Sequence, residues 1–185
     1  LIEFEADIAC EFEAGHIHAP VHLHGGNEDQ LIEIFKEVKP DDYVFSTHRS
    51  HYHALLHGVP PGRVKSEIMA GQSISLQFPD FNFYTSAIVA GICPIALGVA
   101  MTGQKCWVFV GDMGAETGIF HECHKYSVGH DLPIQFVIED NRYSVETPIR
   151  KVWPFSMLIS LPNLRYYFYV RTYPHQGTNK GKGSF

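Results

Sequence analysis

The fold is decided by residues 106–141, which read CWVFVGDMGAETGIFHECHKYSVGHDLPIQFVIEDN. Residues Cys106 to Val110 form a continuous apolar run, as expected of a strand that is buried on both faces of a parallel sheet. Residues 117–129 have the spacing of an amphipathic helix, and residues 134–141 form a second apolar strand. The predicted buried face of the helix comprises Ile119, Phe120, Cys123 and Ser127. Strand, helix and strand in this order predict one right-handed βαβ unit.

The sequence on either side of this unit extends the same pattern. Apolar spacing predicts helices within residues 1–15, 27–37 and 85–103, and a further helix that ends before Val59. In the third of these, Pro94 marks a kink or the beginning of the helix. Short strands are predicted at Tyr43–Ser46 and at Tyr166–Val170. The expected fold is α/β, a mostly parallel sheet with helices on both faces, in a single domain over 1–185 with a frayed tail at 179–185.

Composition excludes several classes of function. The chain has 185 residues, a net charge of −6 and no basic stripe, so nucleic acid is not an expected partner. Apolar runs are too short to span a bilayer, and the acidic first residues differ from a signal peptide, so we expect a cytoplasmic protein without membrane contact. The four cysteines occur singly, which predicts buried thiols rather than disulfides.

Two polar residues follow the predicted buried strands directly. Asp112 ends the first strand and Asn141 ends the second. Because ligands of open α/β sheets bind at the carboxyl ends of the strands, we expect both side chains at one edge, where their oxygens suit Mg²⁺. Strand alternation turns Asp140 away from this site. The turn at 111–118 leads into the predicted helix, whose N-terminus favours an anion such as a diphosphate.

Plainer alternatives exist for each of these residues. Asp112 and Asn141 are also common strand-end residues that turn the chain. The twelve histidines admit a zinc or iron site, because the segments 16–24 and 48–57 contain closely spaced pairs. No acidic or cysteine ligands stand near them in the sequence, which disfavours that site.

Several segments in order resemble one known family. Gly111-Asp112 followed by EDNRY at 139–143 resembles the thiamine diphosphate signature that opens with GDG and closes on asparagine. The other segments are HLHGGNE at 22–28, STHRSH at 46–51, AIVAGICPIALGVA at 87–100 and RTYPHQGT at 171–178. Together they identify the chain as similar to the alpha subunit of thiamine diphosphate-dependent 2-oxo acid dehydrogenases.

The resemblance implies roles for individual residues. Asp112 and Asn141 would bind magnesium by their side chains and Tyr143 by its backbone carbonyl, while Arg49 would clamp the diphosphate of the cofactor. The remaining cofactor-binding residues would be His48, Val89, Met113 and Gly114, with Val89 as an apolar wedge. His175 and His51 match family histidines near the reacting carbon, and His175 would stabilise or protonate the oxygen derived from the carbonyl.

The sequence also departs from the family pattern. Met113 replaces the second glycine of GDG, and His48 stands where the family usually has tyrosine. The stretch between Pro148 and Tyr166 is shorter than in longer relatives, which carry a loop over the site there.

The implied function is decarboxylation of a 2-oxo acid with transfer of the acyl or aldehyde unit. It would need a beta subunit, because no pyrimidine-binding domain with its activating glutamate is recognisable in the sequence, and a heterotetramer is the default assembly. A lipoyl domain is a further candidate partner. The alternatives are a split transketolase-like or carboligating subunit and, from another class, a non-catalytic nucleotide- or metal-binding module.

Overall fold

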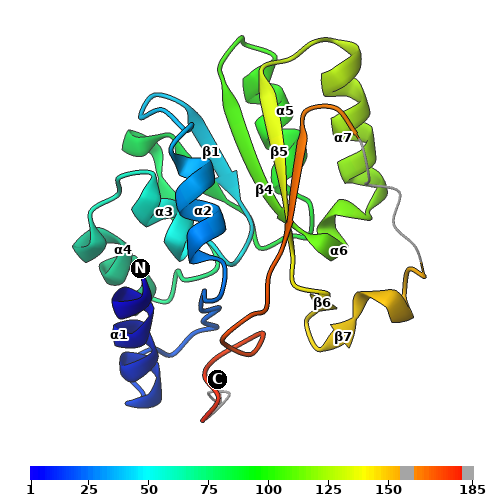
Figure 1. Ribbon diagram of the computed structural model, residues 1–185. Coiled ribbons are helices and arrows are strands. Elements are labelled where there is room, and N and C mark those ends of the chain that lie inside the picture. Colours follow the sequence, from blue (N-terminus) through cyan, green and yellow to red (C-terminus); the bar gives the residue numbers. More distant parts are fainter. Residues whose placement is uncertain (155–160, 181–185) are drawn as a thin grey trace.

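The computed structural model describes residues 1–154 and 161–180, and within them six strands form one sheet in the order β2-β3-β1-β4-β5-β8. All neighbouring strands are parallel except β2 and β3 (Figure 1). The strands are β1 (Tyr43–Ser46), β2 (Gln77–Phe78), β3 (Phe83–Thr85), β4 (Cys106–Gly111), β5 (Ile134–Asp140) and β8 (Leu164–Phe168), and β6 (Tyr143–Ser144) pairs with β7 (Thr147–Pro148) in a small separate hairpin.

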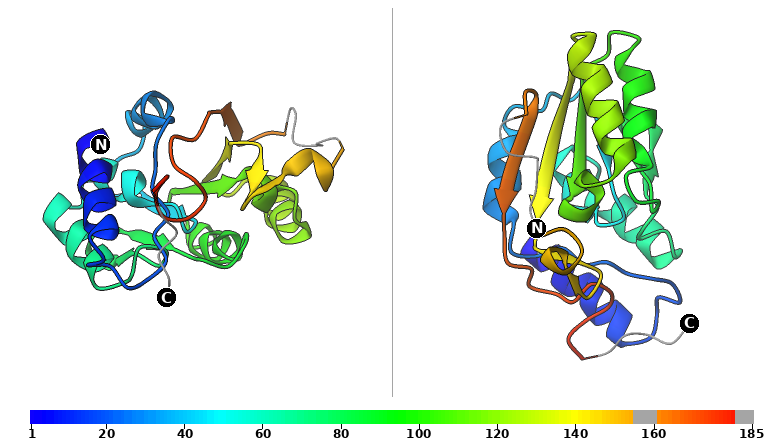
Figure 2. Two further views of the ribbon diagram at one scale, coloured as in Figure 1. Left: turned by 90° about the horizontal axis from the view of Figure 1, so that it is seen from below. Right: turned by 90° about the vertical axis from the view of Figure 1, so that its right-hand side faces the viewer.

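Helices cover both faces of the sheet, so the predicted α/β fold is confirmed (Figure 2). The helices are α1 (Ile2–Glu13), α2 (Glu28–Phe35), α3 (His51–Leu56), α4 (Pro61–Met69), α5 (Ile92–Ala100), α6 (Asp112–Ala115) and α7 (Gly118–Gly129), with 3₁₀ turns at Pro79–Phe81 and Ile149–Lys151. Side chains alternate along each strand. Phe109 and Val137 therefore pack under α1 to α4, whereas Val110 and Ile138 pack under α5 and α7.

The predicted βαβ unit is confirmed as β4, α7 and β5, with β4 and β5 parallel and in register from Cys106 opposite Ile134. Thr117 caps α7, because its hydroxyl accepts a hydrogen bond from the Phe120 N–H at 3.4 Å. One predicted core position of α7 is wrong. Ile119 is 39% exposed. His124 belongs to the buried face of the helix instead, and its Nε2 donates to the Pro162 carbonyl at 2.7 Å.

Two further boundaries differ from the predictions. The helix expected over residues 85–103 begins only at Ile92, since Ala90 has a φ of 54°, and Pro94 lies in its first turn. The last strand lies two residues earlier than predicted, because it pairs with β5 from Leu164 opposite Phe136. The short strands β2 and β3 and helix α4 were not predicted. Of the tail at 179–185, residues 181–185 lie outside the described part, and Lys180 forms an ion pair with Glu13 at 3.1 Å.

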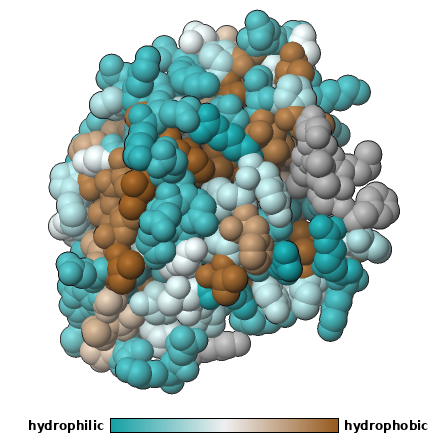
Figure 3. All heavy atoms as spheres, in the orientation of Figure 1, coloured by the Kyte–Doolittle hydropathy of each residue, from teal (hydrophilic) through white to brown (hydrophobic). Residues whose placement is uncertain are grey.

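The surface of the molecule is mixed in polarity. In Figure 3, hydrophilic side chains cover most of the face shown, with apolar side chains in separate groups between them. In the described residues, none of the helices combines the length and the apolarity that crossing a bilayer requires.

Candidate active site

A cavity of about 280 Å³ lies at the carboxyl edge of the sheet. The segment that follows each parallel strand lines it, namely 47–49 after β1, 87–90 after β3, 111–114 at the end of β4, 141–145 after β5 and Tyr169 after β8. His22, Ile74, Glu139 and His175 complete the wall. The cavity therefore occupies the place where open α/β sheets bind their ligands.

All the predicted site residues except His51 line this cavity. The lining set comprises Arg49, His48, Val89, Asp112, Met113, Gly114, Asn141, Tyr143 and His175. His22 also lines it and was not predicted, although it opens the HLHGGNE segment that had been singled out. The tertiary structure therefore gathers residues from five segments that are far apart in the sequence.

Asp112 is one of two buried acids in the cavity wall, the other being Glu139. The Oδ1 of Asp112 accepts a hydrogen bond from the Met113 N–H at 3.0 Å, whereas its Oδ2 is buried without a hydrogen-bond partner. Burial and the neighbouring Asp140 carboxyl raise the pKa of Asp112 to about 7. A divalent cation bound at Oδ2 would satisfy this oxygen and relieve the repulsion between the two acids.

Asp140 does not line the cavity, as strand alternation predicts, but its carboxyl lies beside that of Asp112. The even-numbered residues of β5 face α5 and α7, and α6, which starts at Asp112, lies on that same side. Asp140 accepts hydrogen bonds from the Arg142 N–H at 2.7 Å and from the Tyr166 hydroxyl. Asp112 therefore has a second carboxyl group beside it, although Asp140 itself does not line the cavity.

Asn141 and Tyr143 are linked by a turn. The Asn141 side-chain oxygen accepts from the Tyr143 N–H at 2.9 Å, and its amide donates to the Tyr169 hydroxyl at 3.2 Å. A carbonyl oxygen has two lone pairs, so Asn141 retains one for a cation. Its side chain is held in place by both contacts, as a metal ligand requires.

Arg49 joins two distant segments at the cavity wall. Its Nε donates to the Leu23 carbonyl at 3.0 Å and a terminal nitrogen donates to the His175 carbonyl at 3.3 Å. A guanidinium has five N–H groups, so these two bonds leave donors for an anion in the cavity.

Three imidazoles meet in the same wall. His22 Nε2 lies 3.1 Å from His175 Nε2, and the ring of His48 lies 4.6 Å from that of His22. Burial lowers the pKa of His22 to about 2 and that of His48 to about 3. Both rings are therefore neutral near pH 7.

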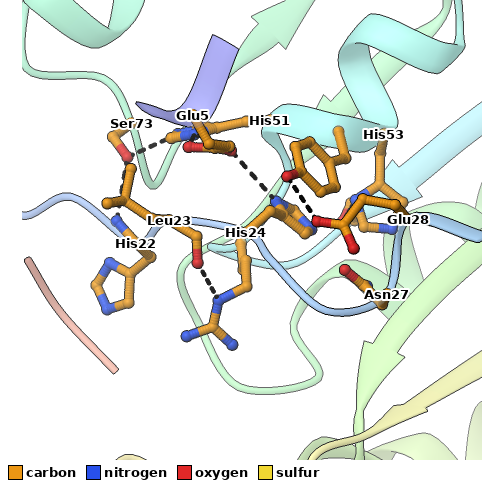
Figure 4. Close-up of polar contacts among 12 residues, drawn as sticks. Glu5, His22, Leu23, His24, Asn27, Glu28, His51, His53 and Ser73 are labelled. Atoms are coloured by element: carbon orange, nitrogen blue, oxygen red, sulfur yellow. Dashed lines mark hydrogen bonds and ion pairs between the residues drawn. The ribbon is translucent and has the colours of Figure 1, made fainter. Parts of the chain in front are cut away.

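His51 lies behind the wall of the cavity. Its Nδ1 donates to Glu5 Oε1 at 2.9 Å, and its Nε2 accepts from the Ser73 hydroxyl at 2.9 Å (Figure 4). Ser73 Oγ in turn accepts from the backbone N–H of His22 at 3.4 Å. His51 is fully buried, so it supports the segment that carries His22 instead of facing the cavity.

The turn after β4 approaches the cavity closely. A Cβ on Gly114 would lie 2.7 Å from Val110 Cγ1, so only glycine fits without a shift. The helical turn that reaches the cavity is the four-residue helix α6. The N-terminus of α7 was expected there, but α7 begins after the last lining residue of this segment. Met113 lines the cavity next to Gly114, and Val89 stands at its rim with 62% of its surface exposed.

These features define an α/β protein whose ligand site lies at the carboxyl edge of a parallel sheet, with a buried acid, a glycine turn and an arginine around one cavity. The chain belongs to the dehydrogenase E1 component family, whose model matches residues 1–154. The family resemblance seen in the sequence is thereby confirmed.

Two relatives illustrate the similarity. The alpha subunit of acetoin:2,6-dichlorophenolindophenol oxidoreductase from Cupriavidus necator is 29% identical over 161 residues, covering 78% of this chain and 48% of that protein. The pyruvate dehydrogenase E1 component subunit alpha from Porphyra purpurea is 30% identical over 165 residues, covering 77% and 48%. The chain thus spans about half the length of these relatives.

Proposed function

We propose that this chain is the alpha subunit of a thiamine diphosphate-dependent enzyme that decarboxylates a 2-oxo acid and transfers the acyl unit, working with a beta subunit. The observation that supports this most directly is the buried, unpartnered Oδ2 of Asp112 at the edge where all the parallel strands end. Membership of the E1 family and the alpha-subunit names of both relatives agree with it.

Each predicted ligand has a definite task in this proposal. Asp112 and Asn141 would hold magnesium by their side chains and Tyr143 by its backbone carbonyl. Arg49 would bind the diphosphate with its remaining donors. Thiamine diphosphate, when bound, supplies the nucleophile and the electron sink for cleavage next to a carbonyl.

The protein groups around the cavity would orient the substrate and move its protons. His175 reaches the cavity from the last described segment, next to the neutral rings of His22 and His48. A neutral imidazole near the substrate oxygen can donate or accept a proton. Val89 at the rim would exclude water and support the cofactor.

A partner chain is proposed because apolar surface is left open beside the cavity. Ile88 and Val89 at the rim are exposed, and so are Ile95 and Met101 on the outer side of α5. The same helix is also open at Gly98, because a Cβ added there would meet no atom within 4 Å. A beta subunit that covers this surface would bring the glutamate needed by the aminopyrimidine, in a heterotetramer by default. A lipoyl domain is the proposed acyl acceptor.

Calorimetric titration with thiamine diphosphate, with and without Mg²⁺, tests this proposal. We expect binding that requires Mg²⁺ in the wild-type chain and is at least about a hundredfold weaker in Asp112→Asn. Asp41→Asn makes the same charge change at an exposed position and should bind normally. Magnesium-dependent binding that survives Asp112→Asn would contradict the proposed ligand.

The alternative of a non-catalytic module is favoured by one observation, the Met113 side chain in the cavity wall. Met113→Gly recovers the glycine of the family signature. If the wild type binds no thiamine diphosphate and Met113→Gly does, the hypothesis of a non-catalytic module is supported. If the wild type binds thiamine diphosphate and a second chain co-purifies with it, the hypothesis of an enzyme subunit is supported.

A further inference from the structure

A second cluster of polar side chains lies on the opposite face of the sheet from Asp112. It consists of His24 from the segment between α1 and α2, His53 from α3 and Glu139 from β5. One nitrogen of each histidine and one carboxylate oxygen of Glu139 all lie within 4.8 Å of one another. The three side chains are buried, with residue exposures of 1%, 0% and 6%.

Strand alternation separates this cluster from the Asp112 site. Glu139 precedes Asp140 in β5, so the two acids point to opposite faces. Glu139 shares its face with Val137 and Phe109, under α2 and α3. It also reaches the cavity wall, which provides a path from solvent into the cluster.

The cluster contains buried polar atoms that lack partners. His24 Nδ1, His53 Nε2 and Asn27 Oδ1 are all buried without a hydrogen bond. His53 Nε2 lies 3.2 Å from Glu139 Oε1, and the Asn27 amide donates to that same oxygen at 3.3 Å. Buried polar atoms without a hydrogen bond are rare and destabilising, so an additional occupant that binds these atoms would stabilise the group.

Neighbouring side chains hold these groups in orientations suited to binding a cation. His53 Nδ1 lies 3.4 Å from Ser46 Oγ, which leaves Nε2 for the cluster. The Tyr167 hydroxyl donates to Glu139. Hydrogen bonds that fix the orientation of histidine and carboxylate side chains are typical of metal sites.

The charges of the cluster also match a divalent ion. Glu5 is fully buried, and its Oε1 lies 3.8 Å from His24 Nδ1. Together with Glu139 it places two buried carboxylates beside the two histidines, whose rings pack against Tyr52 and Phe109. Two buried negative charges are stabilised when a dication lies between them.

We propose that His24, His53 and Glu139 bind a divalent transition metal ion that links α3 and the 22–28 segment to β5. Two imidazoles and one carboxylate are ligands for Zn²⁺, Co²⁺, Mn²⁺ or Fe²⁺, whereas Mg²⁺ prefers oxygen ligands alone. Bonds of about 2.1 Å place tetrahedral ligand atoms about 3.3 Å apart, so small side-chain rotations complete the site. Asn27, whose Nδ2 donates to Glu139, also has a buried Oδ1 without a hydrogen-bond partner.

Titration of the full, chelator-treated chain with Co²⁺ tests the site, with visible absorption and the melting temperature as readouts. No thiamine diphosphate is present, so failure here leaves the proposed function unaffected. We expect Co²⁺ to bind the wild type and to raise its melting temperature. Glu139→Gln keeps the size of the side chain and should weaken binding at least about a hundredfold, as should His53→Gln.

His48→Gln is the matched control, because His22, His48 and His175 also offer ligand atoms within 4.8 Å of one another. This variant should retain the Co²⁺ signal. The proposal is overturned if the wild type binds no Co²⁺, if Glu139→Gln binds it as tightly as the wild type, or if His48→Gln alone loses the signal. If His53→Gln does not fold, Glu139→Gln and His48→Gln decide the question.

Discussion

Replacing Gly26 by alanine should separate two segments that together hold the cavity wall. Gly26 has a φ of 93°, and a Cβ there would lie 2.0 Å from the backbone oxygen of Val170. Ordinary contact begins at 3.4 Å, so the segments must move apart by about 1.4 Å. The hydrogen bond from the Thr172 N–H to the Gly25 carbonyl joins the same segments and would be strained.

The expected loss has two parts. The left-handed backbone costs alanine about 1 to 2 kcal/mol relative to glycine. Forcing a methyl group against backbone adds about 1 to 3 kcal/mol, since a carbonyl cannot rotate away as a side chain can. Gly26→Ala should therefore reduce the free energy of unfolding by about 3 kcal/mol.

Urea unfolding monitored by tryptophan fluorescence measures this loss, with two glycines as controls. Gly103 has a φ of 87°, and a Cβ there would meet no atom within 4 Å, so Gly103→Ala should lose only the backbone part. Gly62 has no positive φ, and a Cβ there would meet no atom within 4 Å, so Gly62→Ala should not reduce the free energy of unfolding. Equal losses for Gly26→Ala and Gly103→Ala would refute the close contact with Val170.

Three further predictions concern stability. Thr117→Ala removes the acceptor for the Phe120 N–H and should cost about 1 kcal/mol in urea unfolding, whereas Thr117→Ser should retain it. Phe109→Ala removes a fully buried ring and should cost about 3 to 5 kcal/mol; a loss below about 1 kcal/mol would contradict its place in the core. The pKa values of His22 and His48 are lowered from 6.5 by burial, so below pH 6.5 the unfolded chain binds more protons than the folded chain. Stability should fall as the pH drops below 6.5, by at most about 1.4 kcal/mol per pH unit for each histidine, and the raised pKa of Asp112 offsets at most one of the two. A urea midpoint that stays constant from pH 7 to about pH 5 would contradict this prediction.

The central strands were predictable because burial on both faces leaves a local signal. Cys106–Val110 is a continuous apolar run, residues 134–138 are apolar except for Gln135, and Tyr43–Ser46 was predicted with its observed bounds. The two- and three-residue strands β2 and β3 are too short to show alternation. The last strand was misplaced by two residues, since its aromatic run has no clear ends and only its pairing with β5 sets them.

The residues of the cavity were predictable where they follow a strand directly. Asp112 and Asn141 stand at strand ends, and the carboxyl edge of a parallel sheet brings them to one place. His51 was predicted near the reacting carbon, but it lies behind the cavity wall, hydrogen-bonded to Glu5 and Ser73. No local pattern indicates that α1 supplies a buried acid to this histidine.

The sequence by itself determined the parallel sheet, the edge at which the cavity lies and the family, because each depends on residues that are close neighbours in the chain. Only the tertiary structure decided that Asp140 stands beside Asp112 and that Glu139 meets His24 and His53 on the other face. Periodicity shows which side of its own element a residue faces. It does not show which distant segment packs against that side, and burial of the intervening core is what brings those segments together.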